Sequence, residues 1–311
     1  MKKHINYLVF IILIILFPIF VTENYTLSIG IFAGINTLLA MGLSLLMGYA
    51  GQASLGQAGF YGIGAYVSAI LAQKFGIPVV FSFCLAAFVS AIAAVLLAIP
   101  ALRLKGHYLA VATLGFGEII YIILNELGPG GPSGFGDIPN ISFFGYKLTS
   151  SREYFYFIWG TVFVLIIFSY NIINSRIGRA MRAIHDTEIG SSAMGIDVSG
   201  LKIKAFILSA VYASIAGSFY AHYVTFISPT SFSLFQSILI LTMVVIGGAS
   251  NLWGAVVGAV IITVLPELLR KFEELDVLIY GLILIFFLLF LRKGIVPTLA
   301  EILKKKGNVN A

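Results

Sequence analysis

The sequence predicts an all-α polytopic membrane protein with about ten transmembrane or partly re-entrant helices. Of the 311 residues, 59% are hydrophobic and only 10% are charged. A soluble chain has roughly a quarter charged residues because its surface faces water, so a soluble globule is excluded. The aromatic content of 14% with so little charge also excludes a disordered chain. Ten spans of about 20 residues would use roughly 200 residues, which leaves short loops and no further soluble domain.

Apolar runs bounded by charge, glycine or proline define the candidate spans. They fall near residues 5–22, 27–48, 57–73, 78–99, 107–125, 154–173, 205–227, 234–250, 253–269 and 277–291. Two of them, 57–73 and 253–269, are short for a full crossing, so we expect them to be tilted, broken or re-entrant. Residues 1–27 begin like a signal peptide, but no small-residue cleavage site precedes Glu23. We therefore expect an uncleaved membrane span there.

The distribution of lysine and arginine predicts the orientation, because cytoplasmic loops are enriched in both. With the N-terminus inside and ten crossings, fourteen of the 19 basic residues lie on the inner side: Lys2, Lys3, Arg103, Lys105, Arg176, Arg179, Arg182, Lys202, Lys204, Arg292, Lys293, Lys304, Lys305 and Lys306. The outer side holds the other five: Lys74, Lys147, Arg152, Arg270 and Lys271. We therefore expect both termini in the cytoplasm, with 292–311 as a basic cytoplasmic tail. This bias explains the net charge of +6 without a nucleic-acid partner.

The long cytoplasmic loop at about 174–204 carries the most informative pattern. Ile177, Met181 and Ile184 have the spacing of one helix face, and arginines lie between them. A second helix start follows at 186–188, where acidic side chains favour the positive helix end. The pattern fits either a helix pair that docks into a cytoplasmic partner or a surface segment resting on lipid headgroups. The candidate docking residues are Arg179, Arg182, Asp186, Glu188 and Gly195, a glycine suited to end the second helix.

Glu118 is the one carboxylate well inside a predicted span. A charge at the bilayer centre costs about 2.5–3.5 kcal/mol on insertion scales, so such residues are usually functional or paired. One interpretation makes Glu118 a polar element of a translocation path, or a proton carrier. The other makes it a structural hydrogen-bonding group, with Asn125 or a serine or threonine as its partner.

A glycine-rich run between residues 48 and 64 surrounds three polar residues. It lacks the strand-to-helix context of a phosphate loop, and the chain has no G-x-x-x-x-G-K-S/T motif. The chain is therefore not expected to bind ATP and Mg²⁺ or to hydrolyse ATP. The glycines are expected to serve close helix packing. The alternative places Gln52, Ser54 and Gln57 on an unwound stretch that faces a substrate path.

Metal and disulfide chemistry find no support in the sequence. No group of His, Cys and acidic residues has the spacing of a metal site. His107 and His222 lie near span ends and are expected to be interfacial. The single cysteine, Cys84, is expected to be a small buried hydrophobe.

Two short segments of the chain have similar sequences. Gly51-Gln52-Ala53-Ser54 recurs as Gly247-Gly248-Ala249-Ser250, each time after a long apolar run and before a short one. This similarity fits either a duplication within the bundle, as in many transporters, or a chance match of small residues.

Five motifs in order resemble the permease subunits of branched-chain amino acid ABC importers of the LivM type. They are S-R-I-G-R-A-M-R-A-I-H-D-T-E-I-G-S-S-A-M-G-I-D (175–197), G-Y-A-G-Q-A-S-L-G-Q-A-G-F-Y-G-I-G-A-Y (48–66), L-R-L-K-G-H-Y-L-A-V-A-T-L-G-F-G-E-I-I (102–120), G-G-P-S-G (130–134) and V-I-G-G-A-S-N-L-W-G-A-V-V-G-A (245–259). The resemblance covers nearly all of 28–291, which would be the permease domain. It identifies 174–204 as the coupling loop that contacts an ATPase.

The resemblance implies a multi-pass protein of a bacterial or archaeal cell membrane that is not itself an enzyme. Its implied partners are a second, LivH-type permease, two ATPase subunits that bind ATP and Mg²⁺, and an extracytoplasmic solute-binding protein. One departure is Tyr121, where family members often carry a basic residue. Related importers carry urea, short amides or small acids. The resemblance therefore defines the substrate less well than it defines the type of transporter.

Two other classes of protein fit parts of the sequence. A proton-coupled secondary transporter would use Glu118 as its proton carrier, and it would transport without partner subunits. An intramembrane enzyme would need a nucleophile such as Ser54 with His222, but no third orienting group is visible. The sequence therefore favours the permease and predicts no catalytic residue.

Overall fold

The structure is a computed structural model that describes residues 2–21, 23–101, 104, 106–143, 146–269, 281–282, 285 and 294–299. Its α-helices are α1 (Lys2–Phe20), α2 (Asn24–Ser44), α3 (Gln57–Lys74), α4 (Val79–Ala101), α5 (His107–Leu127), α6 (Ser151–Asn174), α7 (Arg176–Asp186), α8 (Glu188–Ala193), α9 (Val198–Val224), α10 (Leu234–Gly247) and α11 (Leu252–Leu269). The shorter elements are a π-helix, η1 (Leu45–Tyr49), two 3-10 helices, η2 (Gly131–Ser133) and η3 (Pro229–Phe232), and the antiparallel strands β1 (Ser142–Phe143) and β2 (Tyr146–Lys147).

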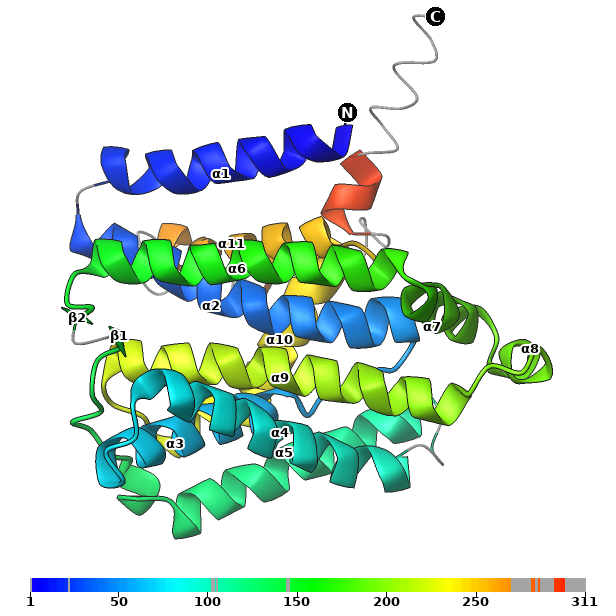
Figure 1. The fold of residues 1–311 in the computed structure, drawn as a ribbon, viewed down its shortest axis with the longest axis horizontal. Coiled ribbons are helices and arrows are strands. Elements are labelled where there is room, and N and C mark those ends of the chain that lie inside the picture. Colours follow the sequence, from blue (N-terminus) through cyan, green and yellow to red (C-terminus); the bar gives the residue numbers. More distant parts are fainter. Residues whose placement is uncertain are drawn as a thin grey trace, which may run out of the picture.

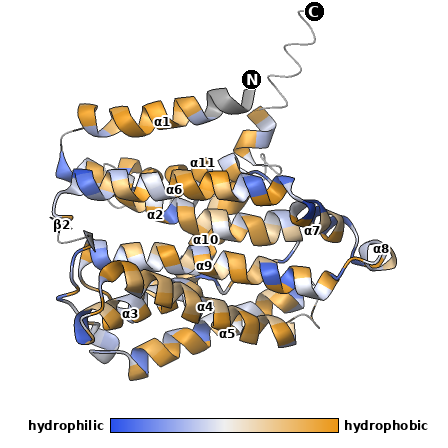
Figure 2. Cartoon of the chain, viewed as in Figure 1, coloured by the Kyte–Doolittle hydropathy of each residue, from blue (hydrophilic) through white to orange (hydrophobic). Residues whose placement is uncertain are grey.

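The long helices run side by side along one direction, with α7 and α8 at one end and β1 and β2 at the other (Figure 1). In the described part of the chain, six helices are long and apolar enough to cross a membrane: α2 with η1, α4, α5, α6, α9 and α11. Apolar residues cover the bundle, whereas hydrophilic residues gather toward its two ends (Figure 2). The predicted all-α membrane architecture is confirmed.

The predicted spans up to 253–269 all fall on helices, whereas 277–291 lies almost entirely outside the described residues. The span expected at 234–250 is shorter than predicted. Its helix α10 has 14 residues, or about 21 Å at the usual helical rise, against about 30 Å for the hydrocarbon core. It starts directly after η3, whose Pro229 and Phe232 are buried, so the chain enters α10 from within the bundle.

Close packing of small residues surrounds α9, which contacts α2, α3 and α4. The inward side of α4 is a row of small, fully buried residues at every fourth position: Ser82, Ala86, Ser90, Ala94 and Ala98. Small residues let helix backbones approach closely. Between α3 and α9, a Cβ atom at Gly64 would lie 2.3 Å from the Ser214 carbonyl oxygen. The packing role predicted for this glycine run is therefore confirmed.

The opposite side of α4 is exposed and bulky, with Phe81 and Phe88 uncovered. Cys84 lies on this side and is exposed. The expectation of a buried cysteine is therefore wrong, because α4 buries its row of small residues and turns the cysteine outward.

Two breaks interrupt the helices, and the second packs against the end of α2 and η1, directly before the first. The first break, residues 51–56, follows η1 and precedes α3, and the second break, residues 248–251, separates α10 from α11. Ser44 Oγ donates a hydrogen bond to the Ala249 carbonyl oxygen (2.7 Å). A Cβ atom at Gly48 would lie 1.9 Å from that same oxygen, so only glycine fits there. The segment 247–250 thus packs against η1, which directly precedes the segment 51–54, while the duplication itself stays a prediction.

The loop between α5 and α6 folds back onto the end of α9. Phe135 and Ile227 form a β-bridge, and His222 Nδ1 donates to the Pro139 carbonyl oxygen (2.6 Å). The Tyr154 hydroxyl donates to the His222 carbonyl oxygen (3.0 Å). His222 is fully buried, so its expected interfacial position is wrong: the loop covers it.

Candidate functional site

The first break is held in place by hydroxyl groups from two other helices. Gly51 opens it with a φ of +67°, a conformation that favours glycine. The Leu55 N–H donates to Thr113 Oγ1 of α5 (2.9 Å), and the Ala58 N–H donates to Ser237 Oγ of α10 (3.0 Å). Non-helical backbone at membrane depth needs such partners because lipid supplies none. The break therefore ties α5 and α10 to the start of α3.

Gln52, Ser54 and Gln57 lie on the first break or directly after it, and all three are buried. The Gln57 amide donates to the Ser209 carbonyl oxygen and accepts from the Ser209 hydroxyl, both at 3.2 Å. Gln52 Nε2 donates to the Ala50 carbonyl oxygen (3.1 Å). Ser54 Oγ accepts from a backbone N–H of the break (3.3 Å). The unwound stretch is as predicted, but these polar groups are bound within the chain.

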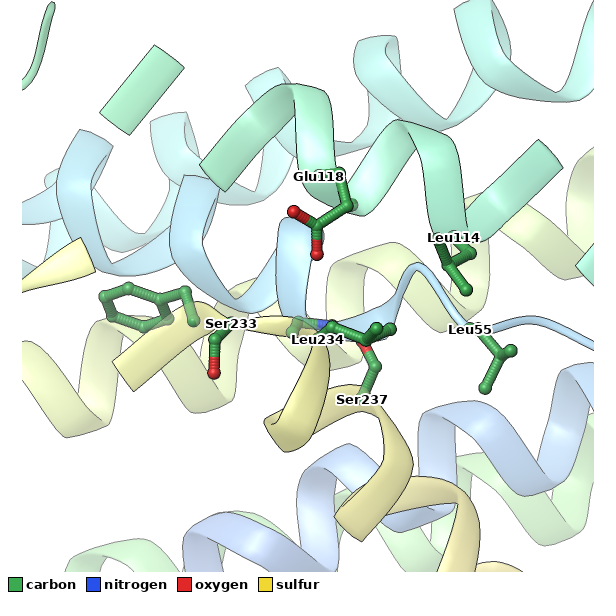
Figure 3. Close-up of a pocket in the computed structure, with 9 residues that line it drawn as sticks. Leu55, Leu114, Glu118, Ser233, Leu234 and Ser237 are labelled. Carbon is green, nitrogen blue, oxygen red and sulfur yellow. The ribbon is translucent and has the colours of Figure 1, made fainter. Parts of the chain in front are cut away.

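Glu118 projects from α5 into a small pocket beside the first break (Figure 3). The pocket is lined by Leu55, Ala58, Leu114, Gly117, Glu118, Phe232, Ser233, Leu234 and Ser237. The Glu118 side chain is half-buried, and its carboxylate has no hydrogen-bonding partner among the described residues. Asn125, the partner considered from the sequence, donates instead to the neighbouring Glu126 carboxylate (3.1 Å). The structure therefore separates Glu118 from Gln52, Ser54 and Gln57, none of which lines this pocket.

The pocket combines a carboxylate, two hydroxyls and apolar walls, but as it stands it has no room for a water-sized molecule. Ligand sites commonly hold about 300–1,000 Å³, so this pocket can form only part of one. It opens beside α5, the least covered of the long apolar helices: 17% of the apolar stretch of α5 is buried, against 78% for α2. The remaining wall must therefore come from outside the described residues.

The loop at 174–204, which the resemblance suggests contacts an ATPase, begins with the amphipathic helix α7. Met181 and Ile184 are buried, as predicted, whereas Ile177 is 44% exposed. The buried face of α7 therefore differs from the predicted one at a single position: Gly178 points inward in place of Ile177. A Cβ atom at Gly178 would lie 2.3 Å from the Ile173 carbonyl oxygen, so α7 packs too closely on the end of α6 for a side chain there.

Two candidate docking residues of α7 turn back to the end of α6. Arg179 Nη1 donates to the Asn174 carbonyl oxygen (3.1 Å), and Arg182 Nη2 donates to the Ile173 carbonyl oxygen (3.2 Å). Cations near helix C-termini satisfy carbonyl groups that lack helical partners. Both arginines are otherwise exposed, as is Asp186 at the end of α7.

Helix α8 has a defined start and end. Thr187 Oγ1 accepts from the Gly190 N–H (3.2 Å) at its start, and Gly195 has a φ of +78° beyond its end, as expected for a glycine stop. The Glu188 carboxylate forms an ion pair with Lys202 Nζ of α9 at 2.5 Å. Lys202 is only 3% exposed. The Glu188 side chain therefore points into its own chain.

Two large apolar side chains are exposed on α8 and on the residue that follows it. This helix projects beyond the end of the bundle (Figure 1), and Ile189 and Met194 are 80% and 70% exposed. Large apolar side chains that project into water mark contact surfaces for other proteins. A docking role for α8 would therefore rest on Ile189 and Met194 rather than on Glu188.

Sequence reasoning missed three residues that organise these two sites: Thr113, Lys202 and Ser237. Thr113 and Ser237 look like ordinary polar residues of apolar helices. Lys202 lies 14 positions from Glu188, so helical spacing gives no signal for their pair.

The structure gives no support to metal or nucleophile chemistry. Ser54 and His222 bind separate backbone groups. No group of three or more His, Cys, Asp or Glu side chains that could hold a metal exists in the described ranges.

Apolar spans, a broken helix beside a half-buried carboxylate and a projecting amphipathic loop together define a polytopic membrane permease. The chain belongs to the family described as branched-chain amino acid transport system / permease component, whose model matches residues 25–288. The resemblance seen in the five motifs is thus confirmed over most of the chain. Membership makes the protein a permease component of a transport system.

Named relatives support the same family. The chain is 32% identical to the high-affinity branched-chain amino acid transport system permease protein LivM of Salmonella typhimurium, over 98% of its own length and 78% of that protein. Identity to LivM of Escherichia coli is 31% with the same coverage. The probable LivM of Methanocaldococcus jannaschii is 24% identical over 85% of this chain and 91% of that protein. No solved structure matches the chain.

Proposed function

We propose that this chain is the membrane permease subunit of an ATP-driven importer of branched-chain or related small amino acids. The observation that carries the proposal is the projecting α8, with Ile189 and Met194 exposed, on a chain that lacks a phosphate-loop motif of its own. ATP and Mg²⁺ would bind to two ATPase subunits, one of which docks on α8. The names of the relatives support the cargo class.

The other partners would contact two further surfaces of this chain. A second, LivH-type permease would cover the exposed side of α5 and supply the missing wall of the Glu118 pocket. An extracytoplasmic binding protein would deliver the cargo to the end of the bundle that carries β1 and β2. The assembly would lie in a bacterial or archaeal cell membrane, with both termini of this chain in the cytoplasm.

The Glu118 pocket matches the chemistry of such a cargo. A carboxylate can bind the ammonium group of an amino acid by a charge-assisted hydrogen bond. Leu55, Leu114 and Phe232 offer apolar walls to an aliphatic side chain. We therefore assign Glu118 to the translocation path and treat Gln52, Ser54 and Gln57 as supports of the first break.

The orientation can be tested by labelling on intact cells that lack an outer-membrane barrier. Single cysteines at Ser133 and Ser192, both exposed, are made in a Cys84→Ser background. Ser191 is unsuitable because it is buried. An impermeant thiol reagent should label position 133 and spare position 192, since the charge bias places only the former outside. The opposite labelling pattern would reverse the orientation.

The function is tested by omitting subunits from proteoliposomes. The two permeases, the ATPases and the loaded binding protein should together import amino acid in an ATP-dependent manner. This chain alone should be inert. Uptake by this chain alone under a pH gradient would instead support the second candidate, a proton-coupled transporter. The observation that favours this second candidate is the Glu118 carboxylate, which has no hydrogen-bonding partner among the described residues.

A further inference from the structure

The coupling loop touches the chain immediately before the first break. His185, at the end of α7, donates from Nδ1 to the Gly48 carbonyl oxygen of η1 at 3.0 Å. A Cβ atom at Gly51 would lie 3.2 Å from His185 Cα, so the end of α7 also packs directly on the glycine that opens the break. π-helical turns such as η1 occur frequently at functional sites.

A second contact fixes the loop three residues further on. The Glu188 carboxylate at the start of α8 pairs with the buried Lys202 of α9. Breaking a buried ion pair is costly because it leaves an uncompensated charge, so α8 is held firmly to α9. The short segment between His185 and Glu188 is therefore anchored to two different helices.

On its far side, the first break leads to the Glu118 pocket. Leu55 lines that pocket, and its N–H is bound by Thr113 of α5, the helix that carries Glu118. His185 thus contacts the chain at one end of the break and the pocket lies at the other end, while α8 begins three residues after His185. Hydrogen-bond networks and rigid elements of this kind can carry energetic coupling between sites.

We propose that His185 and Lys202 are positioning residues that transmit movement of α8 to the first break and, through it, to the Glu118 pocket. Lys202 anchors α8, and His185 moves the Gly48 carbonyl with the loop. This inference rests on the proposed function, because an ATPase must move α8. Neither side chain is needed for the surface that α8 presents to a partner.

The hydrogen bond of His185 is tested with two isosteric variants. The Asn amide nitrogen can take the place of Nδ1, whereas the Gln amide nitrogen takes the place of Nε2. The measurement is the number of amino acid molecules imported per ATP hydrolysed, in proteoliposomes that contain the complete assembly. His185→Gln should lower this ratio about fivefold or more, the lower range of coupling between protein sites. His185→Asn should stay near the wild-type ratio.

The ion pair is tested by exchanging its charges. Lys202→Glu and Glu188→Lys should each lower the ratio, because each places two like charges together in a poorly solvated site. The double variant restores opposite charges and should recover most of the ratio. Co-purification with the ATPases shows that each assembly forms.

The inference fails if His185→Asn and His185→Gln give equal ratios, whether both normal or both reduced, or if the charge exchange restores nothing. Such results would leave the proposed function intact, provided that the wild-type assembly imports amino acid with ATP. Absence of ATP-dependent import by the wild-type assembly would instead overturn the proposed function.

Discussion

Consecutive helices α4 and α5 are both largely uncovered and both expose large apolar side chains, but α5 also carries Glu118, whereas α4 has no charged residue. The outward side of α4 carries large apolar groups, with Phe81, Phe88 and Leu96 all more than 60% exposed (65%, 63% and 67%). Helix α5 exposes Val111, Ile119 and Leu127 to a similar degree (66%, 58% and 81%). It differs by adding the half-buried Glu118 and, one turn before it, Gly115, where a Cβ atom would meet no atom within 4 Å.

This difference distinguishes a lipid-facing helix from one that meets protein or a path. Lipid accepts bulky apolar side chains but penalises a carboxylate. Small and polar residues instead mark contacts between membrane helices. An exposed residue of this chain can therefore face either lipid or another protein, and the type of residue indicates which of the two it faces. We infer that α4 faces lipid and that the side of α5 that carries Gly115 and Glu118 faces the second permease and the path.

The largest effect should come from filling the buried row of α4. Ala94 is fully buried, so Ala94→Leu should destabilise the bundle by about 1–3 kcal/mol through overpacking. Ile92 is 46% exposed on the same helix, and Ile92→Leu should leave stability nearly unchanged. Thermal unfolding of the detergent-solubilised protein compares the two. Equal midpoints would contradict the assignment of the two faces of α4.

Glu118 should show the next largest effect, on transport rather than on stability. Glu118→Gln keeps the shape and a hydrogen-bonding amide, so ATP-dependent uptake should fall but persist. Glu118→Leu should reduce uptake about tenfold or more, since it removes the hydrogen bond to the ammonium group of the cargo, and hydrogen bonds to charged groups contribute about 1.5–3 kcal/mol. Initial rates of uptake at matched expression measure both. Full activity of Glu118→Leu would remove Glu118 from the path.

Assembly with the second permease should produce the smallest change, a local one. Nitroxide labels on single cysteines at Ile122 of α5 and Leu85 of α4 start from similar exposures, 55% and 42%. Accessibility to lipid-dissolved oxygen should fall at position 122 when the second permease is present, and should stay constant at position 85. Equal changes at the two positions would mean that α4 and α5 do not differ in what they face.

Sequence reasoning succeeded where length and composition decide the structure. A membrane helix needs only a sufficiently long apolar run, so the runs up to 253–269 coincide with helices. The break after residue 50 and the glycine stop at Gly195 also followed from local conformational preference. The membrane fold was therefore predictable, whereas the coupling role of residues 174–204 stays a prediction.

The direction in which single side chains point was not predictable. Gly178 faces inward in place of Ile177 because α7 packs against the end of α6. His222 is buried because a distant loop folds over it. The Glu188–Lys202 pair joins residues 14 positions apart. Each outcome depends on tertiary neighbours that helical spacing alone does not contain.

The central claim is that ATP hydrolysis in partner subunits drives this permease and that a proton gradient does not. It is tested most directly by uptake into proteoliposomes that contain the complete assembly, with proton gradients collapsed and ATP in excess. We predict that wild-type uptake continues and that Glu118→Gln retains part of it. If wild-type uptake stops when the gradient is collapsed and Glu118→Gln is inactive at every pH, Glu118 is a proton carrier and the claim is wrong.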